Sequence, residues 1–186
     1  MQTLADRELF APASAAKHFY QFYKGREDLF RITIPFLRVG LENGEACVWV
    51  VSRSTGTVEA IEAFEREYDL GRVVRNGQLA IVPAERWYLD RGRFSERKVL
   101  ARWRKFVEEK SRQGFSACRA VGDTAWLVAT DWFRFQVYEK KVHAWLQTDR
   151  LDVHFTALCA YPIRQCSLTQ TKDVLDHHDT VFLSKL

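Results

Sequence analysis

Short β-rich runs alternate with longer helical segments along this chain, and this alternation constrains its fold more than any other feature. The runs are rich in Val, Ile, Phe, Trp and Cys, and each is followed by a segment with apolar residues at helical spacing. This pattern is typical of βα units, which build a mainly parallel sheet. The runs alternate little between apolar and polar residues, so we expect both faces of the sheet to be buried. The sequence therefore predicts a three-layer α/β/α fold.

The predicted elements begin near His18. We expect strands at His18–Tyr23, Ala46–Ser52, Gln78–Pro83, Ala117–Gly122, Thr156–Tyr161 and Thr180–Leu183. We expect helices at Asp28–Leu41, Thr57–Tyr68, Glu96–Arg112, Asp131–Leu146 and Thr169–His177. Gly44 and Gly114 follow two of these helices as stop signals, and Pro35 is expected to kink the first helix.

The chain is expected to form one domain behind a short arm. Residues 1–17 are polar and alanine-rich without a periodic apolar face, which predicts a flexible N-terminal arm. Residues 18–186 contain no linker rich in Pro, Gly or Ser and no repeat, which predicts a single domain. The sequence lacks both the run of ~20 apolar residues that a membrane span needs and the apolar segment of a signal peptide. We therefore expect a cytoplasmic protein that makes no membrane contact.

Candidate ligand-binding residues follow the predicted strands or lie in the segment after the third strand. An open parallel sheet binds its ligand at the carboxyl ends of its strands, so these positions are expected to converge on a crevice. The candidates are Tyr23, Arg53, Trp87, Tyr88, Arg93, Asp123, Trp126 and Tyr161. Their rings and few charges favour a small apolar or mixed ligand. Two alternatives stay open, because Asp123 is also a natural turn cap and Trp87 and Tyr88 are equally suited to packing.

The first strand-to-helix turn lacks the features of a phosphate-binding loop. It reads Tyr23-Lys24-Gly25-Arg26-Glu27-Asp28, with a single glycine followed by two carboxylates. Such a turn neither allows consecutive backbone N–H groups to face a phosphate nor attracts an anion. Neither Gly-x-x-x-x-Gly-Lys-Ser/Thr nor Gly-x-Gly-x-x-Gly occurs, and no serine lies in a Gly-x-Ser-x-Gly elbow. We therefore expect no nucleotide hydrolysis by the usual route and no enzyme activity.

Histidines and cysteines gather late in the chain, at His154, Cys159, Cys166, His177 and His178. Structural zinc sites use short paired spacings, which these positions do not have. No cysteine belongs to a Cys-x-x-Cys pair, and three of the four lie inside predicted strands, namely Cys47, Cys118 and Cys159. We therefore expect reduced core thiols, no metal site and no cofactor.

The positive charge is concentrated in one loop and one helix. The whole chain has a net charge of +4, whereas the segment from Asp90 to Arg112 contains nine basic and four acidic residues, a net charge of +5. A solvated helix face accounts for this segment, and so does contact with an acidic partner, an acidic ligand or nucleic acid. The small total charge argues against direct nucleic-acid binding. The candidate partner-binding residues are Arg97, Arg102 and Arg104.

Several motifs in order resemble those of the MEDS family, the sensory domain named for methanogens, methylotrophs and the regulator DcmR. They are His18-Phe19-Tyr20-Gln21-Phe22-Tyr23, Pro35-Phe36-Leu37, Gly40 to Cys47, Trp49 to Ser52, Gly77-Gln78-Leu79, Trp87-Tyr88, Gly92-Arg93-Phe94, Val99 to Trp103, Gly122 to Leu127 and Leu158 to Pro162. The resemblance covers nearly the whole chain from His18 onward.

This resemblance implies a sensor of small hydrocarbon derivatives or related metabolites in prokaryotic signal transduction. Members of the family are often fused to a histidine kinase or to a DNA-binding helix-turn-helix. This chain shows no such output domain, so we expect a separate kinase or DNA-binding regulator as partner, or a longer parent protein. The family also resembles the RecA and KaiC type of ATPase core without its Walker A loop, which places Asp123 where those ATPases keep a metal-binding carboxylate. The alternative is a degenerate ATPase-like scaffold that binds no metabolite and contacts its partner through the positive segment.

Overall fold

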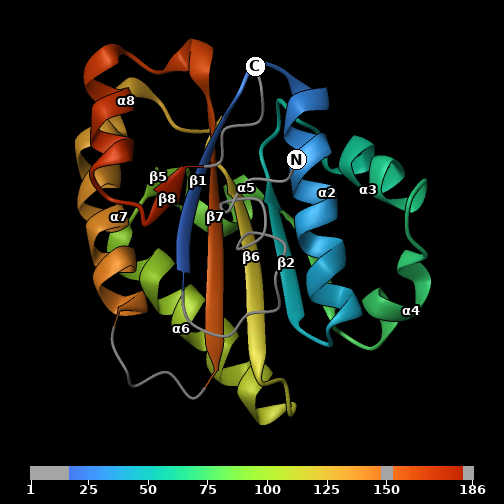
Figure 1. The fold of residues 1–186 in the computed structure, drawn as a ribbon. Helices are drawn as coiled ribbons and strands as arrows, with labels where there is room; N and C mark the ends of the chain where they lie inside the picture. The colour runs from blue at the N-terminus through green and yellow to red at the C-terminus, as the bar shows by residue number, and fades with distance from the viewer. Residues whose placement is uncertain (1–16, 148–152, 182–186) are drawn as a thin grey trace.

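A six-stranded parallel sheet organises the computed structural model, which describes residues 17–147 and 153–181 (Figure 1). Its strands are β1 (Lys17–Tyr23), β2 (Ala46–Val51), β3 (Leu79–Pro83), β6 (Ala117–Asp123), β7 (His154–Pro162) and β8 (Thr180–Val181). They lie in the order β3-β2-β6-β7-β1-β8, and every neighbouring pair is parallel. The carboxyl ends of the strands therefore meet at one edge of the sheet.

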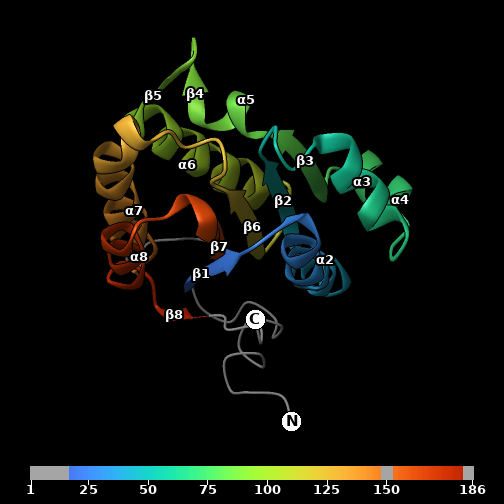
Figure 2. The ribbon, with the colours of Figure 1, turned by 90° about the horizontal axis from the view of Figure 1, so that it is seen from above.

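Helices cover both faces of the sheet (Figure 2). One face carries α2 (Arg26–Glu42), α3 (Thr57–Glu65) and α4 (Leu70–Arg75), and the other carries α5 (Ala84–Tyr88), α6 (Glu96–Arg112), α7 (Trp132–Leu146) and α8 (Leu168–Leu175). A short antiparallel hairpin, β4 (Leu89–Asp90) and β5 (Arg93–Phe94), connects α5 to α6. The predicted three-layer α/β/α architecture is confirmed.

The period-2 alternation of each strand divides the interior into two cores. One core packs against α6 and α7 and includes Tyr20, Val48, Ala120 and Cys159. The other packs against α2, α3 and α4 and includes Phe19, Trp49, Val121 and Leu158. Because both faces are covered, β2 and β6 are buried at every position, as their apolar runs predicted.

The predicted strands and helices are found close to their expected bounds, with two differences. The helix expected at Thr57–Tyr68 ends at Glu65, as α3. A further helix that was not predicted, α4, follows at Leu70–Arg75, where the Asp69 carboxylate accepts a hydrogen bond from the Gly71 amide at 2.9 Å and caps the helix. The segment from Trp87 to Phe94, expected as a loop, contains the end of α5 and the β4–β5 hairpin. Helix α2 contains Pro35, and the kink expected there stays a prediction. The proposed arm, apart from Lys17, and residues 182–183 of the expected last strand lie outside the described residues.

A buried ion pair joins β6 to the turn between α2 and β2. The guanidinium of Arg119, in the centre of β6, donates from Nε and Nη2 to the two carboxylate oxygens of Glu45 at 2.8 and 3.0 Å. Both residues are at most 2% exposed, and Arg119 also donates to the Phe36 carbonyl at 3.1 Å. The apolar pattern of the strand gave no sign that its central arginine points into the core.

Within the described parts of the chain, no helix has the length and apolar character that crossing a membrane requires.

Candidate functional site

The Asp123 carboxylate connects three strands at the carboxyl edge of the sheet. Its Oδ1 accepts hydrogen bonds from the Tyr23 hydroxyl at 2.8 Å and the Ala125 amide at 3.1 Å. Its Oδ2 accepts from the Ser52 amide at 3.2 Å, the Ser52 hydroxyl at 2.5 Å and the Thr55 hydroxyl at 2.5 Å. The predicted convergence of the strand ends is therefore found for β1, β2 and β6.

This network is closed to solvent. Asp123 is 0% exposed and Tyr23 is 5% exposed. Burial raises the pKa of the Tyr23 phenol well above its ordinary value, and the adjacent Asp123 carboxylate raises it further. Both carboxylate oxygens are occupied by donors of the protein itself, so Asp123 stabilises the meeting point of the strands. A ligand-binding role for Asp123 and Tyr23 stays a prediction.

The predicted aromatic residues pack mainly against one another. Tyr88 is 2% exposed and stacks on Trp126, with ring centroids 4.7 Å apart and planes inclined by 18°. The Tyr88 hydroxyl lies over Gly122, where a Cβ would come within 2.3 Å of it. Trp87 packs under α6 against Trp103, with centroids 4.5 Å apart. The packing alternative left open for Trp87 and Tyr88 accounts for these contacts.

A small pocket opens beside Tyr161 at the carboxyl ends of β6 and β7. Its volume is about 80 Å³, and it is lined by Thr124, Leu127, Val128, Trp132, Tyr161, Pro162, Gln165, Cys166 and Gln170. Tyr161 is the one member of the predicted ligand-binding set that lines it. The Tyr161 side chain is 1% exposed, and its hydroxyl has no hydrogen-bond partner among the described residues.

The predicted arginines occupy different environments. Arg53 and Arg93 are exposed, at the loop after β2 and in the hairpin. Arg102 is half-buried and donates to the carbonyls of Trp87 and Leu89, so it holds the end of α5 in place. The exposed Arg97 and Arg104 line a groove of about 500 Å³ together with Glu96, Leu100, Ala101, Lys105, Glu108 and Lys141.

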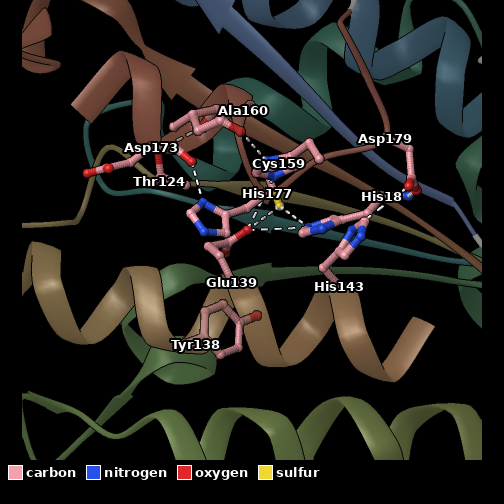
Figure 3. Close-up of polar contacts among 12 residues, drawn as sticks. His18, Thr124, Tyr138, Glu139, His143, Cys159, Ala160, Asp173, His177 and Asp179 are labelled. Atoms are coloured by element: carbon pink, nitrogen blue, oxygen red, sulfur yellow. Dashed lines mark hydrogen bonds and ion pairs between the residues drawn. The ribbon is translucent and has the colours of Figure 1, made fainter. Parts of the chain in front are cut away.

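A second set of polar side chains lies in the core between the sheet and α7, and we refer to it as the buried cluster. It consists of His18 at the start of β1, Glu139 on α7, Cys159 on β7 and His178 in the turn before β8. Glu139 Oε2 lies 3.3 Å from the Nε2 atoms of both His18 and His178, and 3.6 Å from Cys159 Sγ. The His18 Nε2 to Cys159 Sγ distance is 3.4 Å. Figure 3 shows Glu139 pointing from α7 toward His18 and Cys159 on the sheet.

The environment of the buried cluster defines its protonation states. Burial lowers the pKa of His18 to about 4, and the nearby His178 acts in the same direction, so His18 is neutral at pH 7. Burial alone would raise the pKa of Glu139, but the adjacent imidazoles of His178 and His18 outweigh it and lower that pKa to about 2. Glu139 is therefore a carboxylate. Burial, followed by the Glu139 charge, raises the pKa of Cys159, so this residue is a thiol unless a cation binds.

Sequence reasoning singled out Cys159 and His178 but missed His18 and Glu139. Glu139 lies four residues after Phe135 and three before Val142, both buried on the apolar face of α7. A charged residue on such a face was a signal that the sequence offered. The contact with His18 was not visible, because it depends on the pairing of β1 with β7, which places His18 opposite Ala157 and Tyr20 opposite Cys159.

Comparison with known proteins identifies similar sequences. A family model described as MEDS, the methanogen/methylotroph, DcmR sensory domain, matches residues 17–179. The transcriptional repressor DcmR of Methylorubrum extorquens is 23% identical over 168 residues, which cover 89% of this chain and 59% of the repressor. The chain thus spans less than two thirds of that relative's length.

Comparison with solved structures identifies a similar fold. The flagellar accessory protein FlaH of Methanocaldococcus jannaschii superimposes with a TM-score of 0.53, covering 97% of this chain and 76% of FlaH at 10% sequence identity. At this identity the likeness concerns the fold alone. It agrees with the predicted RecA-like arrangement of a mainly parallel sheet between helices.

Proposed function

The chain belongs to the MEDS family of sensory domains, and we propose that it senses a small molecule bound in the pocket beside Tyr161. The position of this pocket carries the proposal, because it lies at the carboxyl ends of β6 and β7. Parallel α/β sheets bind their ligands at this edge. The family membership supports a sensory and regulatory role, and the similarity to a transcriptional repressor agrees with it.

The size and lining of the pocket limit the ligand. A cavity needs roughly 10–15 Å³ to hold one water molecule, so a pocket of about 80 Å³ suits a molecule of a few non-hydrogen atoms. Rings of Trp132 and Tyr161 provide apolar contact, whereas the side chains of Gln165 and Gln170 provide polar groups. Small alcohols, amines and halogenated hydrocarbons have this mixed character.

The experiment is a thermal-melting screen of the purified chain against small alcohols, amines, halocarbons and nucleotides at millimolar concentrations. A ligand that binds only the folded state raises the melting temperature. We expect a shift with at least one small polar hydrocarbon derivative and none with nucleotides, because the first turn lacks a phosphate cradle. Absence of a shift with every compound would contradict the proposal.

A pair of tyrosine variants locates the binding site. Tyr161→Phe removes the buried, unpaired hydroxyl of a tyrosine that lines the pocket and should weaken binding of any active compound. Tyr20→Phe is the matched control, because the Tyr20 hydroxyl is also buried without a partner but does not line the pocket. Equal loss of affinity in both variants would show that the ligand binds elsewhere.

The same proposal includes a non-enzymatic mode of action and a protein partner. A sensor of this kind reports ligand occupancy to a kinase or a DNA-binding regulator, and it does so by a shift in population between two conformations. Arg97 and Arg104 are exposed along the α6–α7 groove and offer a basic surface for an acidic partner. A scaffold without a ligand would use the same surface. Cross-linking in cells should therefore recover a partner with the wild type and lose it with Arg97→Glu/Arg104→Glu. If the chain is a sensor, the amount of cross-linked partner changes when the ligand is added, whereas a scaffold captures the same amount with and without it.

A further inference from the structure

We propose that the buried cluster binds one divalent metal ion of the zinc type. The four side chains offer two imidazole nitrogens, one carboxylate oxygen and one sulfur, all within 4.8 Å of one another. These are the donor types that zinc uses in proteins. The buried cluster and the ligand pocket share no residue, so metal binding and ligand binding can be tested separately.

The spacing of the donor atoms fits tetrahedral coordination. Zinc lies about 2.0–2.1 Å from nitrogen and oxygen ligands and about 2.3 Å from sulfur, so the corners of its tetrahedron are about 3.4 Å apart, or about 3.6 Å where sulfur is one corner. Glu139 Oε2 lies 3.3 Å from each histidine Nε2 and 3.6 Å from Cys159 Sγ, and Cys159 Sγ lies 3.4 Å from His18 Nε2. These four of the six donor–donor distances match the corner spacing, and all six are within 4.8 Å, so the donor atoms surround a point that one ion can occupy.

The orientation of His178 is a second, independent observation. Its Nδ1 lies 2.7 Å from the Val174 carbonyl, which can only accept, so Nδ1 carries a proton. Metal-binding histidines typically use their other ring nitrogen in this way. The Nε2 atom of His178 then points into the cluster and faces Glu139 Oε2 at 3.3 Å.

The charges balance only for a divalent ion. The side chains of His18, Glu139 and His178 are at most 2% exposed, and Cys159 is 9% exposed, so an unbalanced charge here is costly. A divalent ion displaces the thiol proton of Cys159 to solvent, which leaves one thiolate, one carboxylate and two neutral imidazoles. The two negative charges equal the charge of the ion. All four coordination positions are then occupied by the protein, which is the arrangement of a structural metal site.

Such an ion would hold together four segments that are distant in the sequence. It would join the first strand, α7, β7 and the turn that leads into β8. The His178 ring also lies 5.9 Å from that of Tyr161, which lines the pocket, so the two sites are neighbours in the same core.

Cobalt substitution tests this site directly. The untagged chain is treated with a chelator, checked for folding by circular dichroism and titrated with Co²⁺, with zinc content of the untreated protein measured by mass spectrometry. We expect saturation at one ion per chain, with intense visible bands of tetrahedral cobalt and a thiolate-to-cobalt band in the near ultraviolet. If the chelated chain is unfolded, refolding is carried out with and without Co²⁺, and the same bands are measured.

Variants identify the ligands. Cys159→Ser should abolish the thiolate band, and His178→Gln, which changes a residue in a turn, should lower cobalt affinity by at least tenfold. Cys166→Ser and His154→Gln are matched controls outside the cluster and should leave the thiolate band and the cobalt affinity unchanged. Absence of a stoichiometric thiolate band in the wild type would overturn the proposal. A band that survives Cys159→Ser, or that disappears with Cys166→Ser, would overturn it as well.

Discussion

Replacement of Asp123 by asparagine tests the hydrogen-bond network that joins the strand ends. Both carboxylate oxygens receive only donors, and one backbone N–H faces each of them, from Ala125 at Oδ1 and from Ser52 at Oδ2. In Asp123→Asn an NH₂ group replaces one oxygen. The hydroxyls of Tyr23, Ser52 and Thr55 can rotate to accept from it, but a backbone N–H cannot. Either orientation of the amide therefore leaves one buried N–H against another donor.

The expected loss of stability follows from this count. An unpaired buried donor costs about 1–3 kcal/mol, and the remaining bonds lose the charge that makes them roughly twice as strong as neutral ones. We expect the free energy of unfolding to fall by about 2–4 kcal/mol. With a urea m-value of about 2 kcal/mol/M, the unfolding midpoint falls by about 1–2 M.

Equilibrium unfolding in urea, followed by tryptophan fluorescence and circular dichroism, measures this shift. Asp176→Asn is the matched control, because Asp176 is exposed after α8, and it should unfold at the wild-type midpoint. If Asp123→Asn unfolds together with the control, the carboxylate does not stabilise the strand ends in the way the hydrogen bonds indicate. The side chain would then be free for the ligand-binding role that the sequence suggested.

Three further outcomes are expected. Arg119→Met removes one side of the buried ion pair with Glu45 and should lower the free energy of unfolding, measured in urea, by about 3–5 kcal/mol. Arg119→Met/Glu45→Met should recover part of this loss. A double variant no more stable than the single one would refute the reasoning. Gly122→Ala places a Cβ 2.3 Å from the Tyr88 hydroxyl and should lower the melting temperature, and Tyr88→Phe in the same chain should restore part of it. Because three of the four free cysteines are buried and Cys166 is half-buried, a thiol reagent should modify one cysteine in the native protein, and Cys166→Ser should abolish that reaction. Burial raises the pKa of Cys166 to about 11, so this modification should be slow at neutral pH.

The strands and most helices were predictable because their signals are local. The run of β2 is continuous and apolar, and that of β6 is mostly so apart from Arg119 and its last residue Asp123, because helices cover both faces of the sheet. Helix α4, which begins after Asp69, and the hairpin after Tyr88 were missed, because each is short and depends on a local cap or turn. In the same way, chain position identified the edge of the sheet that holds Asp123 but not the partners that occupy its oxygens.

The candidate sites required contacts between distant residues. Of the eight predicted ligand-binding residues, Tyr161 alone lines the pocket, because the rings of Trp87, Tyr88 and Trp126 turn into the core beneath α6 and α7. The spacing of the late histidines and cysteines argued against a metal site, since metal-binding motifs are recognised by short intervals. The buried cluster has no such interval, and its members span residues 18 to 178.

The sequence by itself determined the layered α/β fold and the family, because periodicity and motif order are properties of neighbouring residues. The tertiary structure decided which side chains meet. The strand order β3-β2-β6-β7-β1-β8 brings the first strand beside the last long one, so His18 contacts Cys159 across 141 positions of sequence. Many orders of the same strands would bury the same apolar runs, and the observed order, with α7 packed on the sheet, places a carboxylate, a thiol and two imidazoles around one point.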